Sequence, residues 1–225
     1  MQAFKSIIFI LILSLSVTFT AQASDTDSYA RTLYDLGIIR GTDKGLESEK
    51  TLTRAESAAI MTRLLGKEMS ISKTRYKEKF VDVPDDHWAF GYVMFCYENA
   101  ITKGTGGDTF SPDMQIDARQ FVTLLLRLMK YEDASPDNAL DIAVEIQLCN
   151  SKTAQKLKQN GEFKRGDMFY LLNRSLKTQM YDGTNFARYL ADEGVITKRQ
   201  ADGFDVYLDF ENIDVLIDEL LDGVN

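Results

Sequence analysis

The chain is poor in the residues that most often mark catalytic and metal sites. It has a single histidine, His87, and two cysteines, Cys96 and Cys149. A Ser-His-Asp set would need His87, and no Gly-x-Ser-x-Gly turn is present to carry its nucleophile. Carboxylates are too abundant for any pair to be informative. The two cysteines could form one disulfide, but their apolar neighbours favour free, buried thiols, and their spacing fits no metal motif. We therefore predict no enzyme, no metal site and no cofactor.

Positive charge and loop-forming residues are also scarce. Lysine and arginine number 26 against 34 aspartate and glutamate, a net charge of −8. Such a chain is repelled by nucleic acid and by acidic lipid, so any anion it binds must be held by local basic groups. Only three prolines and 14 glycines occur, and no segment is of low complexity. This composition predicts an ordered, mainly α-helical protein.

Long apolar runs are limited to the N-terminus. Lys5 precedes an apolar stretch over residues 7–17, and Ala21-Gln22-Ala23 then supplies the small residues of a signal-peptidase site. At roughly a dozen residues, the stretch is shorter than the ~20 of a spanning helix. We predict a signal peptide over residues 1–23 and no membrane association after its cleavage, with a retained anchor as the alternative.

Three segments of the chain align with one another. They are residues 52–63 (LTRAESAAIMTR), 116–127 (IDARQFVTLLLR) and 163–174 (FKRGDMFYLLNR). Apolar residues recur in them at offsets of three, four and seven, which indicates one buried helix face. Thr53 with Glu56, and Asp117 with Gln120, form capping boxes at the helix starts, whereas Lys164 with Asp167 keeps half of one.

A second helix and a turn precede each of these segments. The turns are at residues 37–41, 100–104 and 147–151, and glycine-rich loops follow them. Each unit is therefore helix, loop, helix, and the units must pack on one another to bury their apolar faces. Residues 185–196 resemble the first helix and turn of another unit whose second half is not recognisable. We expect an amphipathic helix over residues 210–221 to cap the array.

The order of these motifs resembles that of S-layer homology domains, which tether exported proteins to Gram-positive cell walls. The resemblance covers roughly residues 29–176. It depends most on residues 80–89 (FVDVPDDHWA), on the loop from Gly104-Thr105 to Phe110-Ser111-Pro112, and on Leu52-Thr53-Arg54-Ala55-Glu56. It implies a mainly α fold in which three helix–loop–helix repeats pack with pseudo-threefold symmetry. The expected divisions are a signal peptide at 1–23, repeats at 24–78, 79–133 and 134–178 (the third degenerate), and a C-terminal helical extension at 179–225.

The resemblance also implies a function. The expected protein is a secreted, non-catalytic module of the cell wall or cell surface. Its ligand would be secondary cell wall polysaccharide, made anionic by pyruvate ketals and bound in grooves between repeats. The second repeat departs from the pattern, because Ala118 stands where arginine is expected and Arg119 follows it, so one or two grooves are expected to be competent. The alternative is a protein-interaction module whose repeats have lost wall binding. A protein partner could also bind the acidic C-terminal helix.

Arg54 and Arg165 are the principal candidates for binding the polysaccharide. Each is expected at the first position of a helix, where the macrodipole disfavours a cation by roughly 0.3–1 kcal/mol. A ligand carboxylate would explain that placement, since helix N-termini and arginine forks both favour anions. A structural ion pair, to Glu56 or to an aspartate of the next unit, is the alternative. Arg119 is expected to be solvated.

Five further residues are candidates for contacts with the sugar. Trp88 offers a flat face for stacking on sugar C–H groups, although a core position would also suit it. Asp82 could accept hydrogen bonds from sugar hydroxyls or could cap its own turn. Lys103, Gly104 and Thr105 form a turn with exposed backbone beside a cation, but without the spacing of a phosphate loop.

Overall fold

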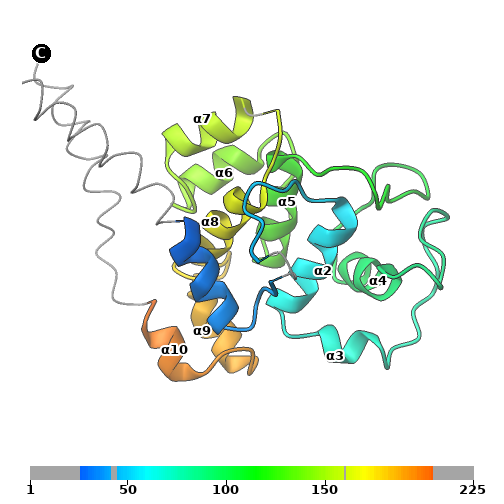
Figure 1. The fold of residues 1–225 in the computed structure, drawn as a ribbon, viewed down its shortest axis with the longest axis horizontal. Helices are drawn as coiled ribbons and strands as arrows, with labels where there is room; N and C mark the ends of the chain where they lie inside the picture. The colour runs from blue at the N-terminus through cyan, green and yellow to red at the C-terminus, as the bar shows by residue number, and fades with distance from the viewer. Residues whose placement is uncertain (1–25, 42–44, 160, 205–225) are drawn as a thin grey trace, which may run out of the picture.

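The protein is built from short helices joined by loops in the computed structural model, which describes residues 26–41, 45–159 and 161–204 (Figure 1). The first described helix covers residues 26–35. The helices that follow are α2 (Arg54–Leu64), α3 (Glu68–Ile71), α4 (Phe90–Glu98), α5 (Ala118–Leu128), α6 (Ala139–Glu145), α7 (Ser151–Gln159), α8 (Arg165–Ser175), α9 (Phe186–Asp192) and α10 (Lys198–Asp202). The prediction of a mainly α fold is confirmed. No helix among these residues is long and apolar enough to cross a membrane.

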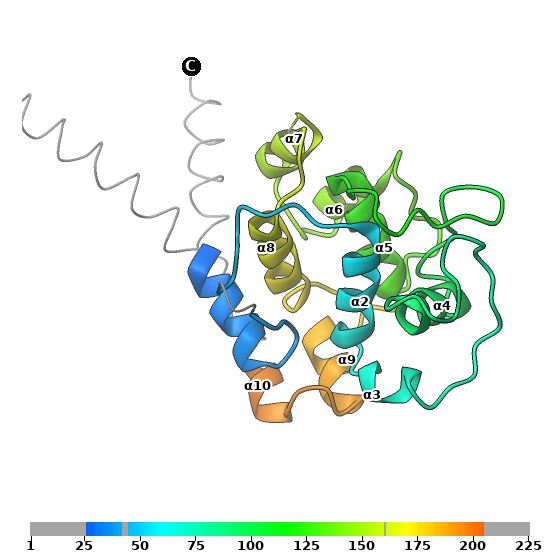
Figure 2. The same ribbon diagram turned by 45° about the vertical axis from the view of Figure 1, so that its right-hand side comes forward.

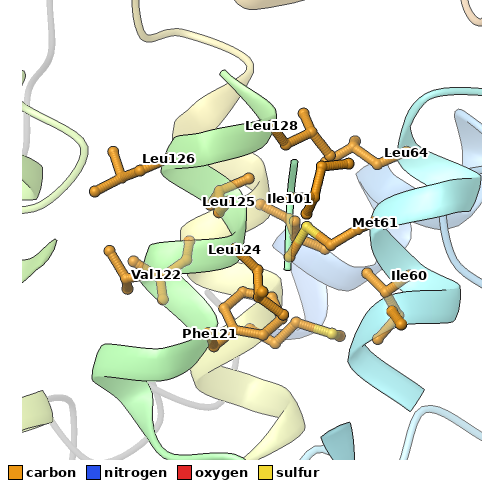
Figure 3. Packing of buried hydrophobic residues seen from close by; sticks show 14 of the residues in the cluster. Ile60, Met61, Leu64, Ile101, Phe121, Val122, Leu124, Leu125, Leu126 and Leu128 are labelled. Carbon is orange, nitrogen blue, oxygen red and sulfur yellow. The ribbon is translucent and has the colours of Figure 1, made fainter. Parts of the chain in front are cut away.

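The second helices of the three predicted repeats are α2, α5 and α8, and they carry much of the core. Met61 and Leu64 of α2 point toward Leu125 and Leu128 of α5, and all four side chains are buried (Figure 3). Each second helix also meets the first helix of another repeat. Helix α2 packs on α4 and α5 packs on α6, while Tyr170 of α8 meets the ring of Tyr29 edge-on at 5.8 Å. Pseudo-threefold symmetry itself stays a prediction.

The starts of the second helices follow the predicted capping. Glu56 N donates to Thr53 Oγ1 at 3.1 Å, and Thr53 N donates to the Glu56 carboxylate at 2.8 Å. Asp117 and Gln120 form the same reciprocal pair. At α8, the Asp167 carboxylate accepts from Lys164 N at 3.1 Å. Local sequence therefore fixes where these three helices begin, and with it the position of Arg54 and Arg165 in the first turn.

The turn after the first helix occurs four times with the same backbone geometry. A residue with positive φ ends the helix, and the next N–H reaches back five residues to a carbonyl. These bonds run from Ile38 to Leu33, Ile101 to Cys96, Leu148 to Ala143 and Val195 to Leu190, at 2.8–2.9 Å. The positive-φ residues are Gly37, Ala100, Gln147 and Gly194. Residues 186–196 thus repeat the first half of a unit, as predicted.

Exchanging glycine and alanine at two of these turns should shift stability in opposite directions. Ala100 has φ 58° and Gly37 has φ 72°, a region that costs a residue with a Cβ about 1–2 kcal/mol. We expect Ala100→Gly to stabilise the protein by about 0.5–1 kcal/mol, after the entropy cost of glycine. Gly37→Ala should destabilise it by about 1 kcal/mol, since a Cβ added there meets nothing within 4 Å and only φ matters. Urea unfolding measures both. Changes of the same sign in the two variants would contradict the assignment.

Repeat 3 differs from the expected helix–loop–helix unit. Helix α7 occupies the stretch where a glycine-rich loop was predicted, and Asn150 caps it by accepting from Thr153 N at 2.8 Å. In the same way, α10 follows the fourth turn, with Thr197 as its cap. A cap residue directly after the turn starts a helix in both places. The predicted signal peptide and the helix over 210–221 lie outside the described residues.

The extension after α8 folds back on repeat 1 and the linker that follows it. Lys67 Nζ lies 3.0 Å from the Glu193 carboxylate, and Val195 lies against Gly66. Figure 2 shows α9 close to the C-terminal end of α2, with α10 beside it. Residues 186–202 therefore cover one end of the array.

Candidate ligand-binding site

Arg54 lies where α2 of repeat 1 meets the loop of repeat 2. Its side chain is only 5 % exposed. Its Nε donates to the Phe110 carbonyl at 2.8 Å, and its guanidinium lies over the Phe110 ring, 4.8 Å from the centroid. The two terminal nitrogens have no hydrogen-bond partner among the described residues, and neither is fully buried. The guanidinium is thus fixed at its base, and its unpaired tip is largely buried but keeps some exposed area.

The charge of Arg54 is not neutralised by contact with an acid. No carboxylate of the described residues lies within 4.0 Å of it, so the structural ion pair considered as an alternative is absent there. Burial lowers the pKa of Arg54, and the more distant charges of Asp117 and Asp82 partly offset this. Glu56 pairs with Lys50 instead, at 3.1 Å. A desolvated cation without an ion-pair partner favours an external anion.

The first-turn amides of α2 are not available to a ligand. Arg54 N donates to the Met114 carbonyl at 2.9 Å, and Ala55 N donates to the Pro112 carbonyl at 3.0 Å. The next amide, that of Glu56, is capped by Thr53. The expectation that this helix N-terminus itself favours the ligand is therefore wrong, because the neighbouring repeat already occupies these donors. Any anion must be held by the guanidinium tip.

Asp82 holds the loop that receives Arg54. Its carboxylate accepts from Phe110 N at 2.9 Å and from Ser111 N at 2.7 Å. This is a capping contact, but to a loop far along the chain and not to its own turn. Thr105 joins the same loop through Ser111, with 3.0 Å between their hydroxyl oxygens. Asp82, Thr105 and Arg54 are thus brought together around residues 105–111.

Removing the Asp82 carboxylate should destabilise the loop. Asp82→Ala leaves the Phe110 and Ser111 amides without their acceptor, which we expect to cost about 2 kcal/mol. Asp82→Asn keeps one acceptor oxygen and should cost about half as much. Thermal unfolding measures both, with shifts of roughly 4–8 °C and 2–4 °C for a chain of this size. Equal stability of all three proteins would show that the carboxylate does not hold the loop.

Arg165 repeats the Arg54 arrangement at a second junction, between α8 and the loop of repeat 1. Its Nε donates to the Leu46 carbonyl at 3.0 Å, and Leu46 aligns with Phe110. Its own amide donates to Lys50 O, as that of Arg54 does to Met114 O. The ring beneath it is Phe169, at 5.5 Å, from its own helix. Burial lowers the pKa of Arg165, and the negative charges of Glu56 and Glu47 raise it.

The equivalent junction of repeat 2 has no such site. Ala118 takes the arginine position and is buried. Leu157 of α7 aligns with Phe110 and Leu46 and is buried as well, so a helix replaces the loop that would receive an arginine. Arg119 is half exposed, with its terminal nitrogen 3.7 Å from the Asp117 carboxylate.

Trp88 and Lys103 do not contact the Arg54 side chain. Trp88 is 57 % exposed, stacks on His87 and lies 6.3 Å from the Tyr92 ring. Tyr92 contacts Arg63, near the end of α2 opposite Arg54, about 13 Å along the axis at 1.5 Å per residue. Trp88 is therefore neither a core residue nor a neighbour of Arg54. Lys103 is exposed and forms no ion pair with an acid of the described residues.

Sequence reasoning did not find the carbonyls that fix the two arginines. The Phe110 and Leu46 carbonyls belong to loops that differ in side chains but share one backbone feature. Ser111 and Glu47, the residues that follow them, both have positive φ, 60° and 48°. The signal that could have found them is their constant offset, eight residues before the arginine position of their own repeat.

The cysteines lie in the core and are not joined. Both are free and buried. Burial raises the pKa of Cys96 to about 12 and that of Cys149 to about 11. These thiols act as small core side chains, and within the described residues no cluster of acids, histidines or cysteines could hold a metal ion.

Comparison with known proteins identifies the family of the segment that contains Asp82 and the Phe110 loop. Residues 79–119 match the S-layer homology domain model. The chain is 27 % identical over 194 residues to the middle cell wall protein of Brevibacillus brevis, covering 81 % of this chain and 18 % of the relative. It is 30 % identical over 179 residues to a cell surface protein of Thermoanaerobacter kivui, covering 74 % and 23 %. A cellulosome-anchoring protein of Acetivibrio thermocellus is 24 % identical over 165 residues, covering 65 % and 37 %.

The first two relatives are named as proteins of the cell wall and of the cell surface, and the chain spans about a fifth of the length of each. The family match begins at residue 79, ends in the first turn of α5 at residue 119, and covers most of the predicted second repeat at 79–133. It includes Asp82 and the loop that holds Arg54. The chain is therefore an S-layer homology domain protein of the cell surface.

Proposed function

We propose that this protein is a non-catalytic module that binds anionic secondary cell wall polysaccharide through Arg54 and Arg165. Relatives that are named as cell wall, cell surface and anchoring proteins support wall binding in general. The finer identity of the ligand, a polysaccharide carrying pyruvate ketals, is what the family resemblance implies, and the two arginines support only its anionic character.

The proposal depends most on the surroundings of the Arg54 guanidinium. The guanidinium is desolvated, has no ion-pair partner among the described residues, and keeps two terminal nitrogens that are unpaired there and not fully buried. Those nitrogens can donate two parallel hydrogen bonds to one carboxylate, which is the geometry a ketal carboxylate offers. Because Nε is already bound to the Phe110 carbonyl, the fork is oriented before the ligand arrives, which lowers the entropy cost of binding.

Arg165 would provide a second site of the same design. Its Nε is held by the Leu46 carbonyl, and its terminal nitrogens have no hydrogen-bond partner among the described residues. Once one site has bound a polymer, the second site meets the same polymer at a raised effective concentration. The second contact therefore strengthens binding without new chemistry. The Ala118 junction would not contribute. We therefore infer two binding junctions and not three.

Co-sedimentation with purified cell wall sacculi tests the proposal. Sacculi stripped of protein should still bind the chain, and polymer lacking pyruvate ketals should bind it at least tenfold more weakly. Binding only to sacculi that retain their proteins would favour the protein-interaction alternative. Equal binding to polymer with and without ketals would exclude the carboxylate as the recognised group.

A further inference from the structure

A pocket of about 530 Å³ lies at the end of α5 remote from the Arg54 junction. Residues 130–134, which follow α5, form one wall, α6 forms another through Ile142, Glu145 and Ile146, and Tyr181 closes it. We call this the Tyr131 pocket, after the aromatic residue in its lining that is fixed most firmly. Its volume lies within the range of small-ligand sites in proteins.

The pocket exists because the linker between repeats 2 and 3 is short. In repeat 2, the longer linker over residues 65–89 covers α4, with Ile71 against Gly91 and Tyr76 close to Glu98. Glu145 aligns with Glu98, since each stands two residues before the positive-φ residue of its turn. The shorter linker over residues 129–138 leaves the face of α6 that carries Glu145 uncovered. The opening is thus a departure from the repeat pattern.

Two tyrosines shape the pocket and are held in place by the backbone. Their rings meet edge-on, 5.6 Å apart and at 88°. Tyr131 Oη donates to the Gln179 carbonyl at 3.1 Å, and Tyr181 N donates to the Met129 carbonyl at 3.2 Å. Tyr181 is nevertheless 73 % exposed. An aromatic wall that is both fixed and open is suited to a guest that stacks on it.

The charge around these rings is negative. Glu132, Asp133 and Glu145 line the pocket, with Lys130 as the single cation of the lining. Burial and the charges of Glu145 and Asp182 raise the pKa of Tyr131, consistent with a negative potential at the ring. The carboxylates do not converge as metal ligands do, since no metal-binding cluster occurs among the described residues. The guest that fits is therefore a cation with its own apolar body.

We propose that the Tyr131 pocket binds an organic cation, an alkylammonium or guanidinium group. The cation would lie over the faces of Tyr131 and Tyr181, its stem along Ile142 and Ile146, and its charge toward Glu145. Cation–π contacts of this kind contribute about 0.5–2 kcal/mol. A lysine or arginine side chain of a partner protein and an amino sugar of the wall both carry this chemistry. The site is distinct from the arginine junctions, which bind anions.

An NMR titration of the full chain tests the proposal. The probes are Nα-acetyl-lysine N-methylamide and glucosamine, each compared with a neutral counterpart, Nα-acetyl-norleucine N-methylamide and N-acetylglucosamine. We expect one or both cations to shift the signals of Tyr131, Glu145 and Tyr181, with a Kd at least tenfold lower than that of the neutral counterpart. Which cation binds identifies its source. Neutral probes that bind as well as the cations would overturn the proposal.

Variants separate the pocket from general attraction to an acidic protein. Tyr181→Ala removes an exposed ring and should abolish the shifts without unfolding the chain. Tyr34→Ala, at another exposed tyrosine (58 %), should leave them unchanged, and so should Arg54→Met, because neither residue lines the pocket. Shifts that persist in Tyr181→Ala would show that the cation does not occupy the pocket.

Discussion

Arg54→Met is expected to lower the affinity of the protein for ketal-bearing sacculi by about 10- to 100-fold. A charge-assisted hydrogen-bond pair contributes about 1.5–3 kcal/mol, and each 1.4 kcal/mol is a factor of ten. Methionine keeps an unbranched apolar stem over the Phe110 ring, so packing is largely retained while the fork is lost. Arg165→Met should have a similar effect, and the double variant should not bind measurably.

The matched control for this series is Arg119→Met. Arg119 lies in the first turn of α5, one place beyond the equivalent of Arg54, and is half exposed. Its removal changes net charge by the same unit but takes no group from a junction, so binding should change less than twofold. Circular dichroism must show that each variant is folded. A folded Arg54→Met that binds normally, or an Arg119→Met that binds as poorly as Arg54→Met, would contradict the assignment.

Gly104→Ala is expected to destabilise the protein by about 3 kcal/mol. Gly104 has φ 82°, and a Cβ added there would lie 2.5 Å from the Thr109 carbonyl oxygen and 2.6 Å from Phe80 Cε1. The backbone penalty of about 1–2 kcal/mol therefore adds to an overpacking penalty of about 1–3 kcal/mol. The corresponding fall in Tm is roughly 6–12 °C.

Gly107→Ala in the same loop distinguishes the two penalties. Its φ is 58°, and nothing lies within 4 Å of an added Cβ. It should cost about 1 kcal/mol, from the backbone alone. If both variants lose a similar amount of stability, the close approach of the loop to Phe80 is not the reason that position 104 needs glycine. Because the loop carries Ser111 and the Phe110 carbonyl, Gly104→Ala should also weaken sacculus binding.

The elements that sequence reasoning predicted best are those fixed by local contacts. The capping boxes of Thr53 and Asp117 each need only residues three apart, and the four turns need only a helix end and a positive-φ residue. The turns recur in every copy and the complete capping pairs in two of them, so the repeats themselves supplied the evidence. Helix α7 was missed because Asn150 can cap a helix or shape a loop, and tertiary packing of Leu157 decides between the two.

The site was predicted only in part because its contacts cross between repeats. Arg54 and Asp82 meet through the Phe110 loop, and no local pattern says which loop receives which arginine. The same is true of the first-turn amides of α2, whose acceptors are the Pro112 and Met114 carbonyls. The residue type does not reveal which backbone carbonyl accepts a hydrogen bond, so only the constant offset of Leu46 and Phe110 within the repeats could have indicated these acceptors. Trp88 was identified as a candidate from the family motif at residues 80–89. That motif gives no indication that Trp88 lies away from Arg54, as the structure shows.

The central claim is that the Arg54 guanidinium tip contacts the anionic group of the wall polymer. NMR of the protein labelled with ¹⁵N-arginine observes that group directly, with Arg54→Met and Arg165→Met providing the assignments. On addition of purified ketal-bearing polysaccharide, the side-chain signals of Arg54 and Arg165 should shift and those of Arg119 should not. If the polysaccharide binds while the Arg54 and Arg165 signals stay in place, the account is wrong.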